Sequence, residues 1–133
     1  MNCRHRILPG REVIIVNAEG LLDLEASRGA LKKIASDPDY KTCFELLMDL
    51  REVTCNLSAT DIFELASFMA YPEPRVPTGR KIALLVSGEQ EFDHAKFLEL
   101  CARNRGLSIA VFTDPEEAVK WLDVEFRENG GEG

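Results

Sequence analysis

Phe44–Leu50 reads Phe-Glu-Leu-Leu-Met-Asp-Leu, a short and nearly continuous apolar run. A run of this length without alternation is typical of a strand whose two faces are both covered, as in parallel sheets. A second run of the same kind, Ile-Ala-Leu-Leu-Val, occupies Ile82–Val86 within the expected strand Lys81–Ser87. Both segments are therefore predicted to lie in the centre of a sheet and to be largely buried.

The segments on either side of these two strands complete an α/β pattern. Cys3–Leu8 and Val13–Val16 are β-rich and are joined through Pro9-Gly10, which predicts an antiparallel hairpin. Helical periodicity appears at Leu21–Ser36, Ser58–Met69, Glu91–Arg105 and the segment after Asp114. Leu107–Phe112 is a last β-rich run.

The order β-β-α-β-α-β-α-β-α predicts one α/β domain, residues 1–133, with a mixed five-stranded sheet and four main helices. The last four strands should be parallel and joined by right-handed crossovers. The proline-rich stretch Tyr71–Arg80 is expected to be a connection rather than a domain linker. Residues 123–133, with three glycines at 130, 131 and 133, are expected to form a frayed tail.

Helix ends are marked by capping residues. Ser58 precedes the second helix, with Asp61 at the position where a capping box has its acid. Asp114 and Pro115 begin the last helix, and Gly106 follows the third. In the third helix we expect Phe97, together with Leu98 and Cys101, to point inward.

Composition excludes several classes of protein. The formal net charge of −7 makes nucleic acid an unsuitable partner, because phosphate binding needs clustered Lys and Arg. No apolar run is long enough to span a bilayer and no secretory signal is present, so a cytoplasmic location is expected. The four cysteines, at positions 3, 43, 55 and 101, show no metal-binding spacing with either histidine and are expected to be reduced thiols.

The chain resembles the SpoIIAA-like group of the STAS and Sec14-like superfamily. The residues that carry this resemblance are Phe44–Arg51, Ser58–Asp61, Lys81–Val86 and Val111–Leu122. The resemblance implies a STAS-like architecture over nearly the whole chain, and a fold of this kind hosts several functions.

STAS antagonists of anti-sigma factors carry a phosphorylatable serine after the central strand, in a motif of the Asp-Ser-Ser-Gly type. This chain has Asp-Leu-Arg-Glu-Val-Thr at positions 49–54, so the aspartate matches and the serine pair and glycine do not. We therefore expect no phosphorylation switch in this loop.

The predicted binding residues lie at the carboxyl ends of the two central strands, where ligands bind in open α/β sheets. Asp49, Arg51, Thr54 and Ser58 follow the first of these strands. Ser87 and Gly88 follow the second. The alternative is purely structural, with Asp49 paired to Arg51 or capping a turn, Ser58 capping its helix, and Ser87-Gly88 forming a plain turn.

No catalytic set is recognisable, and no metal or cofactor is implied. His94 lacks a carboxylate and a nucleophile at suitable spacing and is expected to be a surface or rim residue. Paired acids such as Glu116 and Glu117 belong to the start of a helix. An enzyme is thus the least favoured of three hypotheses.

The favoured hypothesis is a non-enzymatic regulatory or protein-interaction domain that docks an unknown protein partner near Asp49–Asp61. The alternative is a small-molecule or lipid-binding module of the Sec14-like type, which requires an apolar cavity of roughly 300 Å³ or more. Phe68, Met69 and Tyr71 could in addition form a two-fold patch that supports a homodimer.

Overall fold

The computed structural model describes residues 1–8, 10, 12–41, 44–70 and 81–130, with side chains through residue 122. The expected connection at 71–80, Cys43 and the side chains of the expected tail lie outside this range. The elements are β1 (Asn2–Leu8), β2 (Val13–Leu22), α1 (Leu24–Ala35), β3 (Glu45–Cys55), α2 (Ala59–Ala70), β4 (Ile82–Leu85), α3 (Glu89–Arg103), β5 (Ile109–Phe112) and α4 (Pro115–Gly130).

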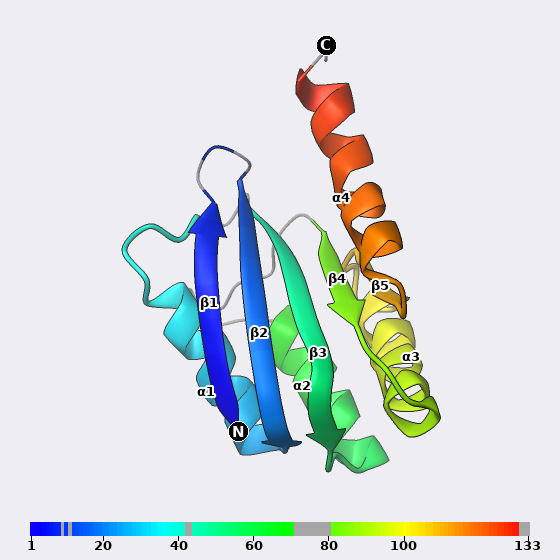
Figure 1. Cartoon of the computed structure of the whole chain (residues 1–133). Helices are drawn as coiled ribbons and strands as arrows, with labels where there is room; N and C mark the ends of the chain where they lie inside the picture. Colours follow the sequence, from blue (N-terminus) through cyan, green and yellow to red (C-terminus); the bar gives the residue numbers. More distant parts are fainter. Residues whose placement is uncertain (9, 11, 42–43, 71–80, 131–133) are drawn as a thin grey trace.

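The predicted topology is confirmed. The five strands form one sheet in the order β1-β2-β3-β4-β5 (Figure 1). β1 is antiparallel to β2, and each later strand is parallel to its neighbour. β3 therefore occupies the centre, and all of Ile82–Val86 is buried, as their apolar runs predict.

The two faces of the sheet are covered unequally. Alternate side chains such as Ile14, Leu46 and Leu84 pack with residues of α1, α2 and α3 in the main core. The opposite face carries a much smaller cluster, in which Ala83 packs against Ala118 and Leu122 of α4. Figure 1 shows α4 beside β4 and β5, and among the described residues no helix lies over β1, β2 or the second half of β3 on this face. The expectation that Phe44–Leu50 is largely buried holds for residues 44–46, whereas residues 47–50 are partly exposed.

Two strands run further than the sequence indicates. β2 continues to Leu22 instead of stopping at Val16, and α1 begins at Leu24 instead of Leu21. The start of α1 is set by Asp23, whose side chain accepts a hydrogen bond from the backbone N–H of Ala26 at 2.8 Å. β3 likewise continues past Leu50 to Cys55 and pairs with the extension of β2.

A β-bulge interrupts the pairing of β2 with β3. Asn17 pairs with Asp49 and Glu19 pairs with Glu52, so β3 has one more residue than β2 over this interval. The extra residue shifts the alternation of β3. Leu50 and Val53, three residues apart, therefore both face the helices.

The predicted caps form as expected. The Ser58 hydroxyl accepts a hydrogen bond from the Asp61 N–H at 3.0 Å, and the Asp61 carboxylate accepts one from the Ser58 N–H at 3.1 Å. At the start of α4 the Asp114 carboxylate accepts from the Glu116 N–H. Gly106 follows α3 with a positive φ of 91°, a conformation that suits glycine.

One expectation about side-chain exposure is wrong, that for Phe97. Phe97 is exposed rather than inward, because it lies on the outer side of α3 while Leu98 and Cys101 pack on the core. Met69 is buried, and Phe68 packs on the core with the Arg28 guanidinium over its ring. Tyr71 lies outside the described residues. Phe68 and Met69, the two described residues of the proposed two-fold patch, therefore pack on the core.

Candidate functional site

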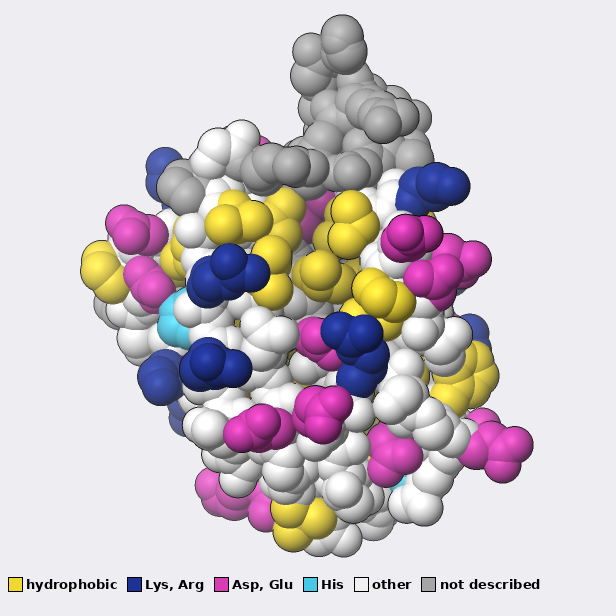
Figure 2. Space-filling model, in the orientation of Figure 1, with side chains coloured by type: hydrophobic (Ala, Val, Ile, Leu, Met, Phe, Trp, Pro, Cys, Tyr) yellow, Lys and Arg dark blue, Asp and Glu magenta, His cyan; other side chains and the backbone are white. Residues whose placement is uncertain are grey.

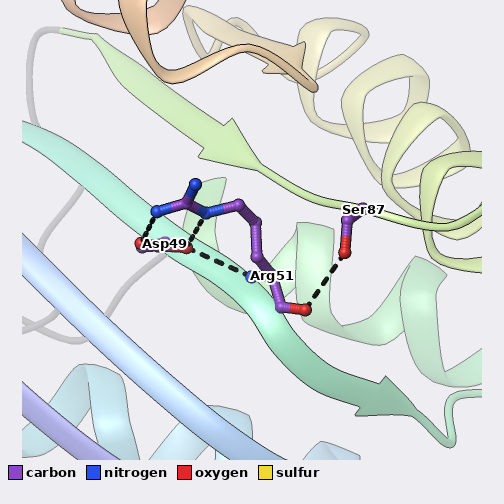
Figure 3. Close-up of polar contacts among 3 residues, drawn as sticks. All are labelled: Asp49, Arg51 and Ser87. Atoms are coloured by element: carbon purple, nitrogen blue, oxygen red, sulfur yellow. Dashed lines mark hydrogen bonds and ion pairs between the residues drawn. The ribbon is translucent and has the colours of Figure 1, made fainter.

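The residues predicted at the end of β3 form a compact polar cluster. Arg51 donates two side-chain hydrogen bonds to Asp49, from Nε to Oδ1 at 2.9 Å and from an Nη to Oδ2 at 2.8 Å. The Ser87 hydroxyl donates to the Arg51 carbonyl at 3.1 Å (Figure 3). Asp49 and Arg51 lie in β3 and Ser87 follows β4, so these residues meet at the same edge of the sheet, as predicted. Asp49 pairs with Leu85, the last residue of β4, so the cluster is level with the carboxyl end of that strand.

The ion pair controls the ionisation of this cluster. The hydrogen bonds that Arg51 donates hold the pKa of the Asp49 carboxyl below its ordinary value, and the same hydrogen bonds, which Asp49 accepts, raise the pKa of Arg51. Both groups are charged at neutral pH, and each supplies the opposite charge and the hydrogen-bond partner for the other. The bidentate geometry matches the structural alternative, in which Asp49 is paired with Arg51.

The cluster lies in a shallow polar groove on the uncovered face of the sheet. The groove has a volume of about 300 Å³ and is bordered by Arg4, Asn17, Glu19, Asp49, Arg51, Glu52 and Ser87, among others. Figure 2 shows charged side chains of both signs on this face, below an area of hydrophobic side chains. A surface of mixed charge suits contacts with a polar partner surface better than the binding of one strongly charged ion.

The other predicted residues lie outside the cluster. Thr54 is exposed near the end of β3, and the hydroxyl of Ser58 is engaged in the capping box of α2. Gly88 precedes α3 with a φ of 92°. This positive φ favours glycine, and a Cβ at this position would approach only the mobile end of the Glu91 side chain, at 2.9 Å from Oε1.

A second feature lies on the opposite side of the sheet, and residue patterns did not locate it. It is an apolar cavity of about 100 Å³ between β1–β4 and helices α1, α2 and α3. Its lining includes Val16, Leu31, Met48, Val53, Leu65 and Ala95. The main core is therefore hollow near the carboxyl ends of the strands.

The exposure of the central strand agrees with this hollow. Met48 and Leu50 face the helices in the middle of the sheet, where complete burial is usual, yet both remain partly exposed. Their neighbour Leu46, on the same face but outside the lining, is buried. Leu84 also borders the cavity and is buried, so Met48 and Leu50 are the more open part of the lining.

Few polar side chains border the cavity. The Ser27 hydroxyl is engaged with the Asp23 carbonyl, and Glu91 and His94 come from the first half of α3. Cys3 and Cys55 add two thiols, and burial raises the pKa of both, which makes them weak nucleophiles. His94, predicted as a rim residue, is indeed partly exposed.

The observed cavity is smaller than the alternative hypothesis requires. Its 100 Å³ is below the roughly 300 Å³ expected for a lipid-sized ligand. A dry engineered cavity of about 150 Å³ is known to accept benzene, so a volume of this order suits a small apolar group. Methionines at positions 1, 48 and 69 in the lining have flexible, adaptable side chains.

Other chemistry receives no support from the geometry. Within the described ranges, no group of three or more His, Cys, Asp or Glu side chains is placed to hold a metal ion. No helix in the described part of the chain is long and apolar enough to cross a membrane. The thiols at positions 3, 55 and 101 are free.

Comparisons with known proteins bear on the fold. No family model matches the chain, and a search of curated proteins finds no match. A solved structure that does match is an uncharacterized DUF3478-family protein with a SpoIIAA-like fold from Shewanella loihica PV-4. It superposes with a TM-score of 0.56 over 90% of this chain and 93% of its own, at 17% sequence identity. With the mixed sheet and its N-terminal hairpin, this match shows that the chain has the SpoIIAA-like α/β fold.

Proposed function

We propose that this protein is a non-enzymatic binding domain that holds a small apolar molecule, or the end of a hydrocarbon chain, in the cavity beneath α1, α2 and α3. The observation that carries this proposal is the apolar hollow of about 100 Å³ at the carboxyl ends of the parallel strands. Open α/β sheets bind ligands at that end.

The chemistry of the lining supports an apolar ligand. Aliphatic side chains and methionines surround the space, and the Ser27 hydroxyl is already engaged. An apolar group that enters such a space loses its contact with water and gains about 0.8 kcal/mol for each buried methylene. The same lining gives a charged or strongly polar group no compensation for its lost hydration.

The experiment is a titration of the protein with linear primary alcohols of increasing chain length, followed by NMR of the lining methyl groups. Each added methylene should tighten binding about fourfold until the chain outgrows the cavity. Ala95→Leu, which places a larger side chain in the lining, should weaken binding at least tenfold. Ala59→Leu, at an exposed position of α2, is the matched control and should bind like the wild type. Absence of saturable binding by every alcohol in the series would overturn the proposal.

A protein-docking function remains the second candidate. The observation that favours it is the uncovered face of the sheet, where the Asp49–Arg51 pair lies in an open polar groove. Docking there would not require an occupied cavity. Affinity capture from the native host should therefore recover a partner with the wild type and with Ala95→Leu, and lose it with Arg51→Ala. A partner retained by Arg51→Ala would exclude this surface.

A further inference from the structure

We infer that the outer side of α2 and α3 is an interface at which a second copy of this chain packs about a two-fold axis. Six large apolar side chains are exposed in the described part of the chain, and three of them, Phe63, Phe97 and Leu100, lie on these two helices. The two helices pack side by side on the helix-covered face of the sheet (Figure 1). This surface therefore lies opposite the polar groove, and none of its three apolar residues lines the cavity.

The three apolar side chains belong to one continuous patch. Nη1 of Arg105 donates a hydrogen bond to the carbonyl oxygen of Cys101 at 2.8 Å, so the side chain of Arg105 runs back along α3. Its guanidinium carbon lies 4.3 Å from the ring centre of Phe63, which brings this ring from α2 beside Cys101. Phe97 lies one helical turn before Cys101, and Leu100 lies one turn after Phe97 on the outer side. Aromatic residues and arginine are enriched at protein interfaces, whereas single exposed apolar residues carry no such signal.

The spacing of exposed residues on α3 suits pairing with another helix. A stripe with alternating spacings of four and three residues runs along the outer side of α3: Asp93, Phe97, Leu100 and Asn104. Two helices that pack along their axes bury residues at this spacing. The two apolar residues occupy the middle of the stripe. An antiparallel pair related by a two-fold axis therefore places Phe97 against Leu100 of the second copy.

The charges along α3 are complementary to a second copy in this orientation. The start of the helix is acidic, with Glu89 and Asp93 exposed, and the last turn carries Arg103, whose side chain is 56% exposed. In the middle, Lys96 and Glu99 form an ion pair within the helix at 2.7 Å. The antiparallel arrangement brings Asp93 level with the last turn of the other helix, so Asp93 meets Arg103 of the second copy twice in each dimer. A parallel pair would instead place acid beside acid.

Sedimentation equilibrium of the full chain tests the interface between about 10 µM and 1 mM, the range in which weak association is measured. We expect a reversible dimer. Phe97→Asp should weaken it about tenfold or more, because it buries an unpaired charge at the centre of the contact. Val119→Asp introduces the same charge at an exposed apolar position of α4 and should associate like the wild type. A wild-type monomer throughout this range, or a dimer that Phe97→Asp leaves intact, overturns the inference.

Two charge reversals test the antiparallel orientation. Asp93→Lys and Arg103→Glu each bring like charges together in their own homodimer and should weaken it. In an equimolar mixture each of the two contacts joins opposite charges again, so the mixture should associate about tenfold or more tightly than either variant alone. Homodimers as stable as the wild type, or a mixture that associates no better than its components, would exclude this pairing.

Circular dichroism of each variant checks its folding, because Nε of Arg103 also donates to the carbonyl oxygen of Ile109 at 2.9 Å. If Arg103→Glu does not fold, Arg103→Gln replaces it. This variant removes the positive charge without reversing it, and its mixture with Asp93→Lys should still associate more tightly than either component. The absence of that gain contradicts the orientation in the same way.

Discussion

Filling the cavity tests whether the hollow exists in solution. Ala95 is buried on the sheet-facing side of α3 and lines the cavity, so Ala95→Leu directs three additional carbon atoms into it. At about 0.8 kcal/mol for each carbon the gain is about 2.4 kcal/mol. The energy associated with cavity volume, about 24 cal/mol per Å³, gives a similar figure for 100 Å³.

The net effect is smaller because the new side chain loses rotamer freedom. Ordering a leucine costs about 0.5–1 kcal/mol, which leaves a stabilisation of about 1.5–2 kcal/mol. For a domain of this size the melting temperature should rise by about 5–8 °C. Calorimetry on Ala95→Leu and the wild type measures the difference, and Ala59→Leu, at an exposed position, should change stability by less than about 0.5 kcal/mol.

The sign of the change decides between a hollow and a solid core. In a filled core the same substitution overpacks the interior and destabilises it by about 1–3 kcal/mol. A lower melting temperature for Ala95→Leu, with Ala59→Leu unchanged, would therefore refute the cavity and the binding function that depends on it.

Three further predictions concern the surface of the domain. Ser58→Ala removes the cap of α2 and should lower the free energy of unfolding by about 0.5–2 kcal/mol. Chemical denaturation should show this as a lower midpoint with an unchanged slope, and an unchanged midpoint would contradict the role of the cap. Asp49 has a lowered pKa, so its stabilising effect exists above the pKa of the unfolded chain and disappears as the pH falls through the folded value. The stability lost in Asp49→Asn should thus be largest near pH 7 and shrink below about pH 4, and a loss that is independent of pH would argue against the ion pair. Protein from its native host should carry no stoichiometric phosphate on Thr54, Ser58 or Thr60, which phosphopeptide analysis can check.

The sequence predicts the fold well because the apolar pattern decides which segments are interior. The runs at Phe44–Leu50 and Ile82–Val86 identify the central strands, and Ser58 and Asp114 locate two helix starts. The lengths of β2 and β3 are less predictable, because their extensions pair mainly with each other and contain glycine and charged residues that propensity disfavours in strands.

The candidate site is predicted only in part, for a similar reason. Asp49, Arg51 and Ser87 meet because the ends of adjacent parallel strands must lie together. A cavity depends on how tightly three helices pack against one sheet, and no single residue pattern encodes that spacing. The small side chains that face it, such as Ala18, Ala30 and Ala95, are a weak sequence signal, since alanine is common in well-filled cores as well.

The bulge in β3 makes this strand unusually tolerant of one change in chain length. Deleting a residue from a regular strand turns every following side chain to the opposite face. Here β3 carries one residue more than its partner between Asp49 and Glu52, so deleting Arg51 would restore a regular strand. Val53 and Cys55 would continue to face the cavity, while the ion pair with Asp49 would be lost. A deletion in the bulge can therefore alter the polar groove without changing which side chains of β3 face the interior.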